Sequence, residues 1–459
     1  MKKILFYSHD TNGLGNLRRA LSICSSLREK CPDLSVLLIS GSPNVHHFKI
    51  PKGIDYIKLP CLTRTEHRGY QAKFLHVEKD TLKQLRSDII RCATANFKPD
   101  LIVVDNKPFG VNHELESALS FSRDNLPNTK IALVLRDILD SPDVTKGVWN
   151  NEKCHQAIEK FYDSILVLGL PEIFDPREEY SFPASTREMV RFCGYIQREP
   201  GRSSQKKVRT ELGITKKEQL VLVTVGGGED GLHLLETYLM GLRGLPKDSA
   251  IRTLMIYGPE MPLSHVEALS FMRTTDNSRV HLLKFTDDFM SYMEASDLVV
   301  SMGGSGTVCE IITLHKRAIV VPRLTPVGDQ GIRAQRMARL GFFQTIHPKD
   351  LTPQTLIQAV VDQLSKGSYP LSSPPLDKSA FPKVTQVLSE LMRTPAPGSS
   401  QFGPMQKEQR RPPRPSFIHS GVFGIHDTTT LSDLQGKPPI RGGKSPRGFR
   451  LVRMIRAVR

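Results

Sequence analysis

The amino-acid sequence predicts an α/β protein made of two doubly wound parallel sheets, each with helices on both faces. Runs of Val, Ile and Leu recur through the first 393 residues, which is typical of parallel strands that are buried on both faces. Segments with helical periodicity separate these runs. Three of the runs end in glycine-rich turns, so the sequence also indicates where a ligand would meet the sheets.

The first group of strands is expected to form one domain, residues 1–196. The run at 3–8 is interpreted as a strand and not as part of a signal peptide, because it is short and no small-residue cleavage site follows it. Further strands are expected at 34–40, 54–59, 100–105, 130–137, 164–169 and 189–193. Amphipathic helices are expected at 16–29 and within 73–97.

A break in this pattern divides the chain. Residues 197–207 are rich in charge, Gly, Ser and Pro, and we interpret them as an interdomain linker. Residues 208–393 are expected to form the second domain. Its strands are expected at 220–225, 252–257, 280–285, 298–301 and 318–321, and its later helices at 329–340, 352–364 and 381–392.

Residues 394–459 form a tail in which Pro, Gly, Arg, Ser and Gln dominate, and we predict that this tail is disordered. The tail carries +9 of the formal net charge of +16, so the basic character of the chain is not evidence that the whole protein binds nucleic acid. Arginines at 450, 453, 456 and 459 alternate with apolar residues, and a basic amphipathic helix on a membrane or partner is the alternative for this end.

Cysteine usage and hydropathy favour a cytoplasmic protein. The seven cysteines are scattered without a C-x-x-C pair, which argues against a disulfide framework or a zinc site. No run reaches the roughly 18–20 apolar residues that a membrane span needs. Peripheral contact with the inner face of a membrane, through basic loops or the tail, stays open as an alternative.

Three glycine-rich turns at strand ends are the candidate ligand sites. They lie at 11–19, 226–231 and 303–307. Glycine allows the backbone to approach a ligand closely, and the unpaired N–H groups of the helix that follows favour an anion such as a diphosphate. None of the turns matches the dinucleotide fingerprint or a Walker loop.

The combination of these features resembles the GT-B glycosyltransferases of family 28. That family includes the N-acetylglucosaminyltransferase of peptidoglycan lipid intermediates, and the chain is more closely similar to a bacterial subgroup of predicted glycosyltransferases. The resemblance covers about residues 1–393 and is strongest at 226–228, at 301–310, at Pro322 and at Asp329-Gln330. It implies two Rossmann-like domains that face a cleft, with the acceptor on the first domain and the sugar nucleotide on the second.

The resemblance also implies roles for residues of the second domain. Glu310 would bind the ribose hydroxyls, and Phe285 would pack against the base. Asp329 and Gln330 would contact the donor sugar. The glycine loops and the helix start would complete the donor site, through Gly226, Gly227, Gly228, Gly303, Gly304, Ser305 and Thr307.

No metal ion or other cofactor is expected, because a leaving diphosphate can be stabilised by a helix dipole and cationic side chains alone. The acidic pairs in the sequence are interpreted as helix caps and solvated turn residues: Asp137 with Asp140, and Asp287 with Asp288.

The first domain departs from the family at the expected catalytic base. The family's first loop ends in Gly-x-Gly-His, and the position of this histidine is Asn16 here, which cannot act as a general base. Asn16 can still cap the helix or orient a hydroxyl. His9, oriented by Asp10, is the candidate replacement, with a structural loop histidine as the alternative.

On the acceptor or phosphate side we expect four residues: Gly13, Gly15, Arg18 and Lys107. A solvated arginine is the alternative for Arg18, and a structural turn is the alternative for the loop that contains Lys107. The polar, basic segment at 63–70 is interpreted as a loop on the acceptor side or as a solvated loop.

The leading hypothesis is a metal-independent glycosyltransferase. It would move a sugar from a nucleoside-diphosphate sugar, with UDP as the favoured nucleotide, to a hydroxyl acceptor with inversion, and a lipid-linked acceptor is one option. A sugar-nucleotide epimerase or hydrolase on the same fold is the second hypothesis. The third is a non-catalytic protein that binds a nucleotide sugar or, less favoured, a nucleic acid.

Overall fold

The computed structural model describes residues 1–8, 15–65, 69–246, 248–274, 279–366 and 380–393. These residues lie in one compact unit, residues 1–400. The predicted disordered tail lies outside the described residues, as do the candidate residues His9, Asp10 and Gly13.

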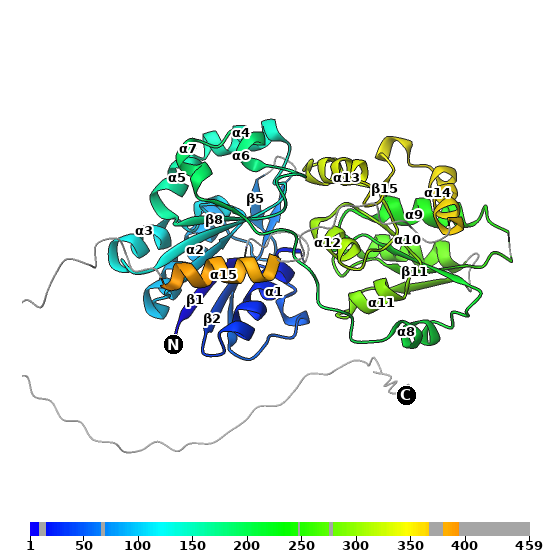
Figure 1. Ribbon diagram of the computed structural model, residues 1–459, viewed down its shortest axis with the longest axis horizontal. Coiled ribbons are helices and arrows are strands. Elements are labelled where there is room, and N and C mark those ends of the chain that lie inside the picture. Colours follow the sequence, from blue (N-terminus) through cyan, green and yellow to red (C-terminus); the bar gives the residue numbers. More distant parts are fainter. Residues whose placement is uncertain (9–14, 66–68, 247, 275–278, 367–379, 394–459) are drawn as a thin grey trace, which may run out of the picture. The chain divides into compact units, whose positions relative to one another are not determined.

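The first half is built on a seven-stranded parallel sheet with the strand order β3-β2-β1-β6-β7-β8-β9 (Figure 1). The inner strands are short apolar runs that are buried on both faces, as their composition predicts, whereas the edge strands β3 and β9 are partly exposed. The strands are β1 Lys3–Ser8, β2 Ser35–Ser40, β3 Ile54–Lys58, β6 Leu101–Asp105, β7 Lys130–Arg136, β8 Ser164–Leu168 and β9 Val190–Phe192.

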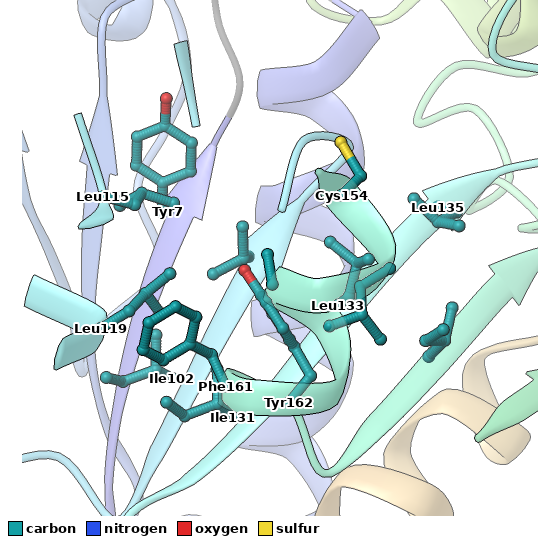
Figure 2. Close-up of a cluster of buried hydrophobic side chains, with 14 of the residues drawn as sticks. Tyr7, Ile102, Leu115, Leu119, Ile131, Leu133, Leu135, Cys154, Phe161 and Tyr162 are labelled. Carbon is teal, nitrogen blue, oxygen red and sulfur yellow. The ribbon is translucent and has the colours of Figure 1, made fainter. Parts of the chain in front are cut away.

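Helices cover this sheet on both faces (Figure 1). On one face, Tyr7, Ile102 and Leu133 of adjacent strands pack against Phe161 and Tyr162 in the core shown in Figure 2. The α-helices are α1 Gly15–Lys30, α2 Lys79–Phe97, α3 Glu116–Asn125, α4 Pro142–Asn151, α5 Cys154–Phe161, α6 Pro176–Glu179 and α7 Ala184–Glu188, and two 3-10 helices are η1 Val45–His47 and η2 Val111–His113.

The segment that was expected to be a polar loop at 63–70 contains a small antiparallel sheet. Its strands are β4 Leu62–Arg64 and β5 Tyr70–Ala72, which pair with Leu62 opposite Ala72. Leu62 and Tyr70 are buried together with Leu82 of α2, so apolar side chains hold the segment against the domain. The loop interpretation was wrong at these two strands, and residues 66–68 lie outside the described residues.

The second half is built on a six-stranded parallel sheet with the order β12-β11-β10-β13-β14-β15. Its strands are β10 Gln219–Thr224, β11 Ile251–Ile256, β12 Val280–Leu283, β13 Leu298–Ser301, β14 Ala318–Val320 and β15 Gln344–Thr345. Its helices are α8 Gln205–Glu211, α9 Leu232–Leu242, α10 Leu263–Thr274, α11 Phe289–Ala295, α12 Ser305–Thr313, α13 Asp329–Arg339, η3 Pro348–Asp350 and α14 Pro353–Ser365. In both sheets the strand order switches sides at the first strand, because β2 and β6 flank β1, and β11 and β13 flank β10. Ligands of doubly wound folds bind at the carboxyl ends of the strands at this point.

The expected linker at 197–207 is too long, because α8 begins inside it. The hydroxyl of Ser204 accepts a hydrogen bond from the backbone N–H of Lys207 at 3.3 Å, and this N-cap starts the helix at Gln205. Val208 of α8 is buried in the core of the second half. The charge-rich composition therefore conceals a short capped helix.

The last described helix, α15 Ala380–Arg393, packs on the first sheet and not on the second (Figure 1). Its apolar residues Ala380, Val384 and Leu388 are buried in one core with α1, β1 and β6. The predicted second domain, 208–393, is thus wrong in its last helix. An amphipathic pattern shows that a helix needs an apolar face to pack against, but it does not show which sheet provides that face.

Candidate active site

A pocket of about 520 Å³ lies at the carboxyl ends of the central strands. Its lining includes Gly15, Asn16 and Arg18 of α1 in the first half. The second half contributes to the lining through the loops that follow β10 and β13 and through the first turn of α13. The structure thereby brings together segments that are about 300 residues apart in the chain.

Most of the donor-side residues that the sequence singled out line this pocket. Gly303 is outside the lining, but its carbonyl oxygen accepts a hydrogen bond from Arg333 Nη1 at 3.0 Å. The lining residues among the predicted set are Gly226, Gly227, Gly228, Phe285, Gly304, Ser305, Thr307, Glu310, Asp329 and Gln330.

Close backbone packing explains the glycines of the loop after β10. Gly228 has φ of +97°, in the left-handed region that favours glycine, and a Cβ atom there would lie 2.1 Å from the carbonyl oxygen of Tyr257. A side chain at this position would push the loop away from the end of β11. The loop is therefore held against the sheet by a contact that only glycine permits.

The start of α12 presents backbone donors to the pocket. Gly304 is the N-cap residue, and its carbonyl accepts the first helical bond from Val308 N at 3.0 Å. The N–H groups of the first turn have no partner within the helix, and the helix dipole adds positive charge there. Ser305, Gly306 and Thr307 of this turn line the pocket, so this end of the helix suits an anionic group.

Glu310 lies one turn further along α12 and is 3% exposed. Its Oε1 atom accepts a hydrogen bond from Arg18 Nη1 at 3.2 Å and lies 3.8 Å from Arg198 Nε. Both arginines come from outside α12, one from α1 and one from the segment between the halves. The Glu310 carboxylate therefore connects α12 to α1 of the first half and to the segment between the halves.

Arg198 is a residue that the sequence reasoning missed. Its Nη1 donates to Ser22 Oγ at 3.1 Å, and its Nη2 would lie 3.7 Å from a Cβ atom at Gly306 in the first turn of α12. Burial lowers the pKa of the guanidinium, while the adjacent Glu310 raises it. A single arginine in a charge-rich segment carries no sequence signal, because only the fold brings it to the helix start.

Asp329 and Gln330 lie at the start of α13. Asp329 is 2% exposed, and its Oδ2 atom lies 3.3 Å from Arg136 and 3.2 Å from Arg333. Burial raises the pKa of this carboxyl, but the nearby arginines outweigh burial and hold the pKa below its ordinary value. The side-chain oxygen of Gln330 accepts a hydrogen bond from the backbone N–H of Arg323 at 3.1 Å.

The interpretation of Asp137 as a cap or solvated turn residue was wrong. Asp137 is 1% exposed, and its two oxygens accept hydrogen bonds from Nε and Nη2 of Arg333, both at 2.7 Å. Asp140 is also bound across the halves, since its Oδ1 accepts from the backbone N–H of Gly328 at 2.8 Å. The local sequence could not show this, because the partner arginine comes 196 residues later.

The other acidic pair matches the expectation at Asp287, whereas Asp288, the N-cap residue of α11, makes no side-chain cap hydrogen bond. Asp287 is exposed and pairs with Arg202 at 2.8 Å. Asp288 is the residue before α11, and its side chain accepts from Ser291 Oγ at 2.8 Å. Among the described residues, no group of three or more His, Cys, Asp or Glu side chains is placed to hold a metal ion.

On the first half, Asn16 is held in place by a buried ion pair. Its Oδ1 accepts from Arg19 Nη2 at 2.8 Å, and the same guanidinium binds both oxygens of Asp105 at the end of β6. Lys107 does not line the pocket, and its amino group lies 3.8 Å from Glu152 and 5.5 Å from the centre of the Tyr70 ring. The structure therefore brings Gly15, Asn16 and Arg18 to the pocket, but not Lys107.

Comparison with known proteins shows which family this chain is similar to. Residues 220–387 match the model of the glycosyltransferase family 28 C-terminal domain. A Clostridioides difficile UDP-N-acetylglucosamine–N-acetylmuramyl-(pentapeptide) pyrophosphoryl-undecaprenol N-acetylglucosamine transferase is 21% identical over 367 residues, which are 78% of this chain and 80% of that protein. The chain is therefore family-28-like, and residues 220–387 carry the match to the family model.

A further relative and two solved structures extend this comparison. An uncharacterized glycosyltransferase of Methanopyrus kandleri is 23% identical over 204 residues, which are 44% of this chain and only 54% of that relative. The Acinetobacter baumannii MurG structure superposes with a TM-score of 0.55 at 13% identity, covering 85% of this chain and 100% of MurG. A UDP-N-acetylglucosamine 2-epimerase structure gives the same TM-score at 12% identity and covers 85% and 94% of the two chains.

The region that matches the family model contains the loop after β10, the whole of α12 and the start of α13. Arg198 and all residues contributed by α1 lie outside it. Among the described residues, no helix is long and apolar enough to cross a membrane.

Proposed function

We propose that this protein is a glycosyltransferase that uses a UDP-sugar as its donor and transfers the sugar to a hydroxyl acceptor with inversion at the anomeric carbon. The proposal rests on one observation: Arg18 and Arg198 both pair with Glu310 beside the first turn of α12. Backbone donors, two guanidinium groups and one carboxylate then lie within a single pocket. That set matches a nucleoside diphosphate, which offers anionic phosphates and neutral ribose hydroxyls.

In this proposal the diphosphate binds at Ser305 and Thr307, with Arg198 as the nearest buried cation. Glu310 accepts hydrogen bonds from the ribose hydroxyls, and Phe285 packs against the base. The Phe285 ring already lies among aromatic groups of the first half, with centroids 6.4 Å from Phe48 and 5.9 Å from His47. Uracil is favoured because relatives in the family carry UDP-sugar names.

The same geometry supports displacement without a metal ion. As the bond between the anomeric carbon and the diphosphate breaks, negative charge grows on the leaving oxygen. Helix dipole and guanidinium groups that are already in position stabilise that charge without reorganisation. An acceptor hydroxyl that attacks from the opposite side of the sugar inverts the anomeric configuration.

Titration calorimetry tests the donor site directly. UDP, GDP, ADP and dTDP are titrated into the wild-type protein and into Glu310→Gln, with Glu267→Gln on the exposed face of α10 as the matched control. UDP is expected to bind the wild type, and Glu310→Gln should weaken binding about tenfold or more, because a charge-assisted hydrogen bond contributes about 1.5–3 kcal/mol. Equal affinity of both glutamate variants would contradict the site.

For the acceptor we propose a lipid-linked hydroxyl at a membrane surface. The relatives' names include a pyrophosphoryl-undecaprenol acceptor, and an apolar segment of the first half is exposed beside the small β4–β5 sheet. Phe74, Leu75 and Val77 of this segment are 64%, 47% and 42% exposed, and the Lys73 amino group lies 5.7 Å from the centre of the Phe74 ring. Apolar side chains next to a cation suit an anionic bilayer.

Vesicle sedimentation tests this surface. The wild type should bind phosphatidylglycerol vesicles more strongly than phosphatidylcholine vesicles, and Phe74→Ser with Leu75→Ser should lose most of that binding. Exposed Leu263 and Phe271 of α10 provide a matched serine variant in the second half. Equal loss of vesicle binding in both variants would indicate nonspecific hydrophobic adsorption and would contradict a specific membrane-binding surface.

A sugar-nucleotide epimerase or hydrolase is the second candidate, and Asn16 is the observation that favours it. An amide held by Arg19 cannot remove a proton from an acceptor at the position where the family has histidine. Incubation with a UDP-sugar alone separates the two functions. Stoichiometric formation of an epimer or of free UDP, unaffected by added acceptors, would favour the second candidate.

A further inference from the structure

Five carboxylates line the pocket within the part of the chain that the structure describes, and four of them are already engaged. Asp230 pairs with Arg323 at 2.8 Å, and Glu260 accepts from Asn44 at 2.7 Å. Glu310 and Asp329 pair with Arg18 and Arg136 at 3.2 and 3.3 Å. Glu229 lines the same pocket and makes no hydrogen bond or ion pair with any described residue. A carboxylate without such partners keeps its lone pairs available for a substrate proton.

The first half offers no alternative within the described residues at the position where the family has its base. Asn16 is an amide, and it is fixed by Arg19. Asp105, which lies behind it, is 1% exposed and is bound through both oxygens by the same arginine. A carboxylate that already accepts hydrogen bonds through both oxygens has few lone pairs left for a substrate proton.

Glu229 also lines the same pocket as the predicted sugar-binding residues Asp329 and Gln330. It is on the glycine loop after β10, next to Gly228, whose tight contact with Tyr257 holds the loop in place. Its chain neighbour Asp230 binds Arg323, which in turn lies 3.8 Å from Asp329. Through these two ion pairs, the chain neighbour of Glu229 is linked to the predicted sugar-binding end of α13.

We propose that Glu229 is the general base that deprotonates the acceptor hydroxyl, and this inference rests on the proposed transferase function. The hydroxyl oxygen forms a bond to the anomeric carbon, and the bond from that carbon to the diphosphate breaks with its electron pair on the diphosphate oxygen. The hydroxyl proton passes to the Glu229 carboxylate. The products are the glycoside, the nucleoside diphosphate and a protonated Glu229, which then returns its proton to solvent.

The charges around Glu229 suit this role. Partial burial is the main cause that raises the pKa of its carboxyl, and the negative charges of Glu260 and Asp230 raise it further. Lys73, which follows β5 in the first half, and Arg323 lower it. The net shift is upward, and a carboxylate with a raised pKa is a stronger base toward a hydroxyl than an ordinary glutamate.

The test measures release of UDP from three probes: UDP-N-acetylglucosamine, UDP-glucose and UDP-galactose. Full-length protein is assayed with water and with a detergent-solubilised bacterial lipid extract as acceptors, over about pH 5 to 9. Glu229→Gln should lower the rate about 100-fold or more. Its dissociation constant for UDP should stay within about threefold of the wild-type value, because the base acts in the transition state.

Two neighbouring substitutions separate a base from a structural residue. Glu260→Gln removes a negative charge and should move the acid limb of the pH–rate profile to lower pH, whereas Lys73→Gln removes a positive charge and should move it to higher pH. A glutamate that only supports the loop would leave that limb in place. Full activity of Glu229→Gln, or loss of the acid limb in His9→Ala instead, would overturn the proposal. Failure of the wild type to bind any UDP compound would refute the donor site itself.

Discussion

Removal of the buried negative charge at Asp137 should destabilise the protein far more than loss of an exposed ion pair in the same contact region. Arg333 is 0% exposed, and two of its nitrogens donate to the Asp137 oxygens at 2.7 Å. Burial alone would lower the pKa of this arginine, but the charge of Asp137 outweighs burial, so the guanidinium stays charged. Asp137→Asn keeps the shape of the side chain and removes only the charge.

The expected magnitude follows from what Arg333 would retain. Breaking a fully buried pair from one side typically costs about 3–5 kcal/mol. Arg333 would still donate to Asp329 at 3.2 Å and to the carbonyl of Gly303 at 3.0 Å, so we expect the lower end of that range, about 3 kcal/mol. The matched control is Glu179→Gln, whose partner Arg336 lies on the same helix α13. In that pair Arg336 Nη2 lies 2.6 Å from Glu179 Oε1, but each of the two side chains is about 30% exposed. Loss of the pair should therefore lower the free energy of unfolding by less than about 1 kcal/mol.

Urea unfolding is the assay, because the chain carries its own probe. The single tryptophan, Trp149, is 5% exposed and stacks on Phe182, so its fluorescence reports on the first half, and circular dichroism reports on both halves. A double-mutant cycle with Arg333→Gln isolates the coupling, which should exceed about 1 kcal/mol. Equal effects of Asp137→Asn and Glu179→Gln, or additive effects in the cycle, would refute the buried-pair reasoning.

Three further predictions concern the donor site, the last helix and acid stability. Arg198→Ala should weaken UDP binding about tenfold or more without changing uridine binding, because the lost partner is a phosphate; calorimetry with both ligands measures this, and equal loss for both would contradict the role. Leu388→Ala should lower the free energy of unfolding by about 2–5 kcal/mol in urea, because the side chain is 0% exposed in the first-half core, and a cost near zero would show that α15 is not part of that core. Hydrogen bonds from Thr215 and Arg252 lower the pKa of Glu218 from 4.5 to about 2. Its contribution to stability should therefore be complete above about pH 4.5 and disappear as the pH falls through about 2, and urea midpoints of Glu218→Gln should lack this acid loss; an unchanged acid loss would assign it to other carboxylates.

Local patterns in the sequence were enough to predict the strands and the glycine turns, whereas the other residues expected on the donor side came from the resemblance to family 28. The reason is that strand burial and helix starts depend on neighbours in the chain. A run such as the one in β10 is apolar because both faces are covered, and the loop after it contains Gly228 because the end of β11 leaves no room for a side chain. The resemblance to family 28 then connected these loops to a nucleotide sugar.

Charged pairs between distant segments could not be predicted in this way. Asp137 looked like a turn residue, and Arg198 looked like part of a solvated linker, because their partners lie far away in sequence. Glu229 was passed over for a related reason, since its significance depends on the fact that the other pocket carboxylates are already bound.

The sequence by itself determined the two-sheet α/β fold and the glycine-rich loops of the pocket, because these follow from local apolar patterns and from turns that favour glycine. The tertiary structure decided which charges converge on those loops and which sheet receives α15. These outcomes depend on long-range packing, in which an arginine or an amphipathic face finds a partner that no local pattern identifies. The turn after β13 was recognisable from the sequence as an anion-compatible helix start, but only the fold shows the two arginines that meet Glu310 beside it.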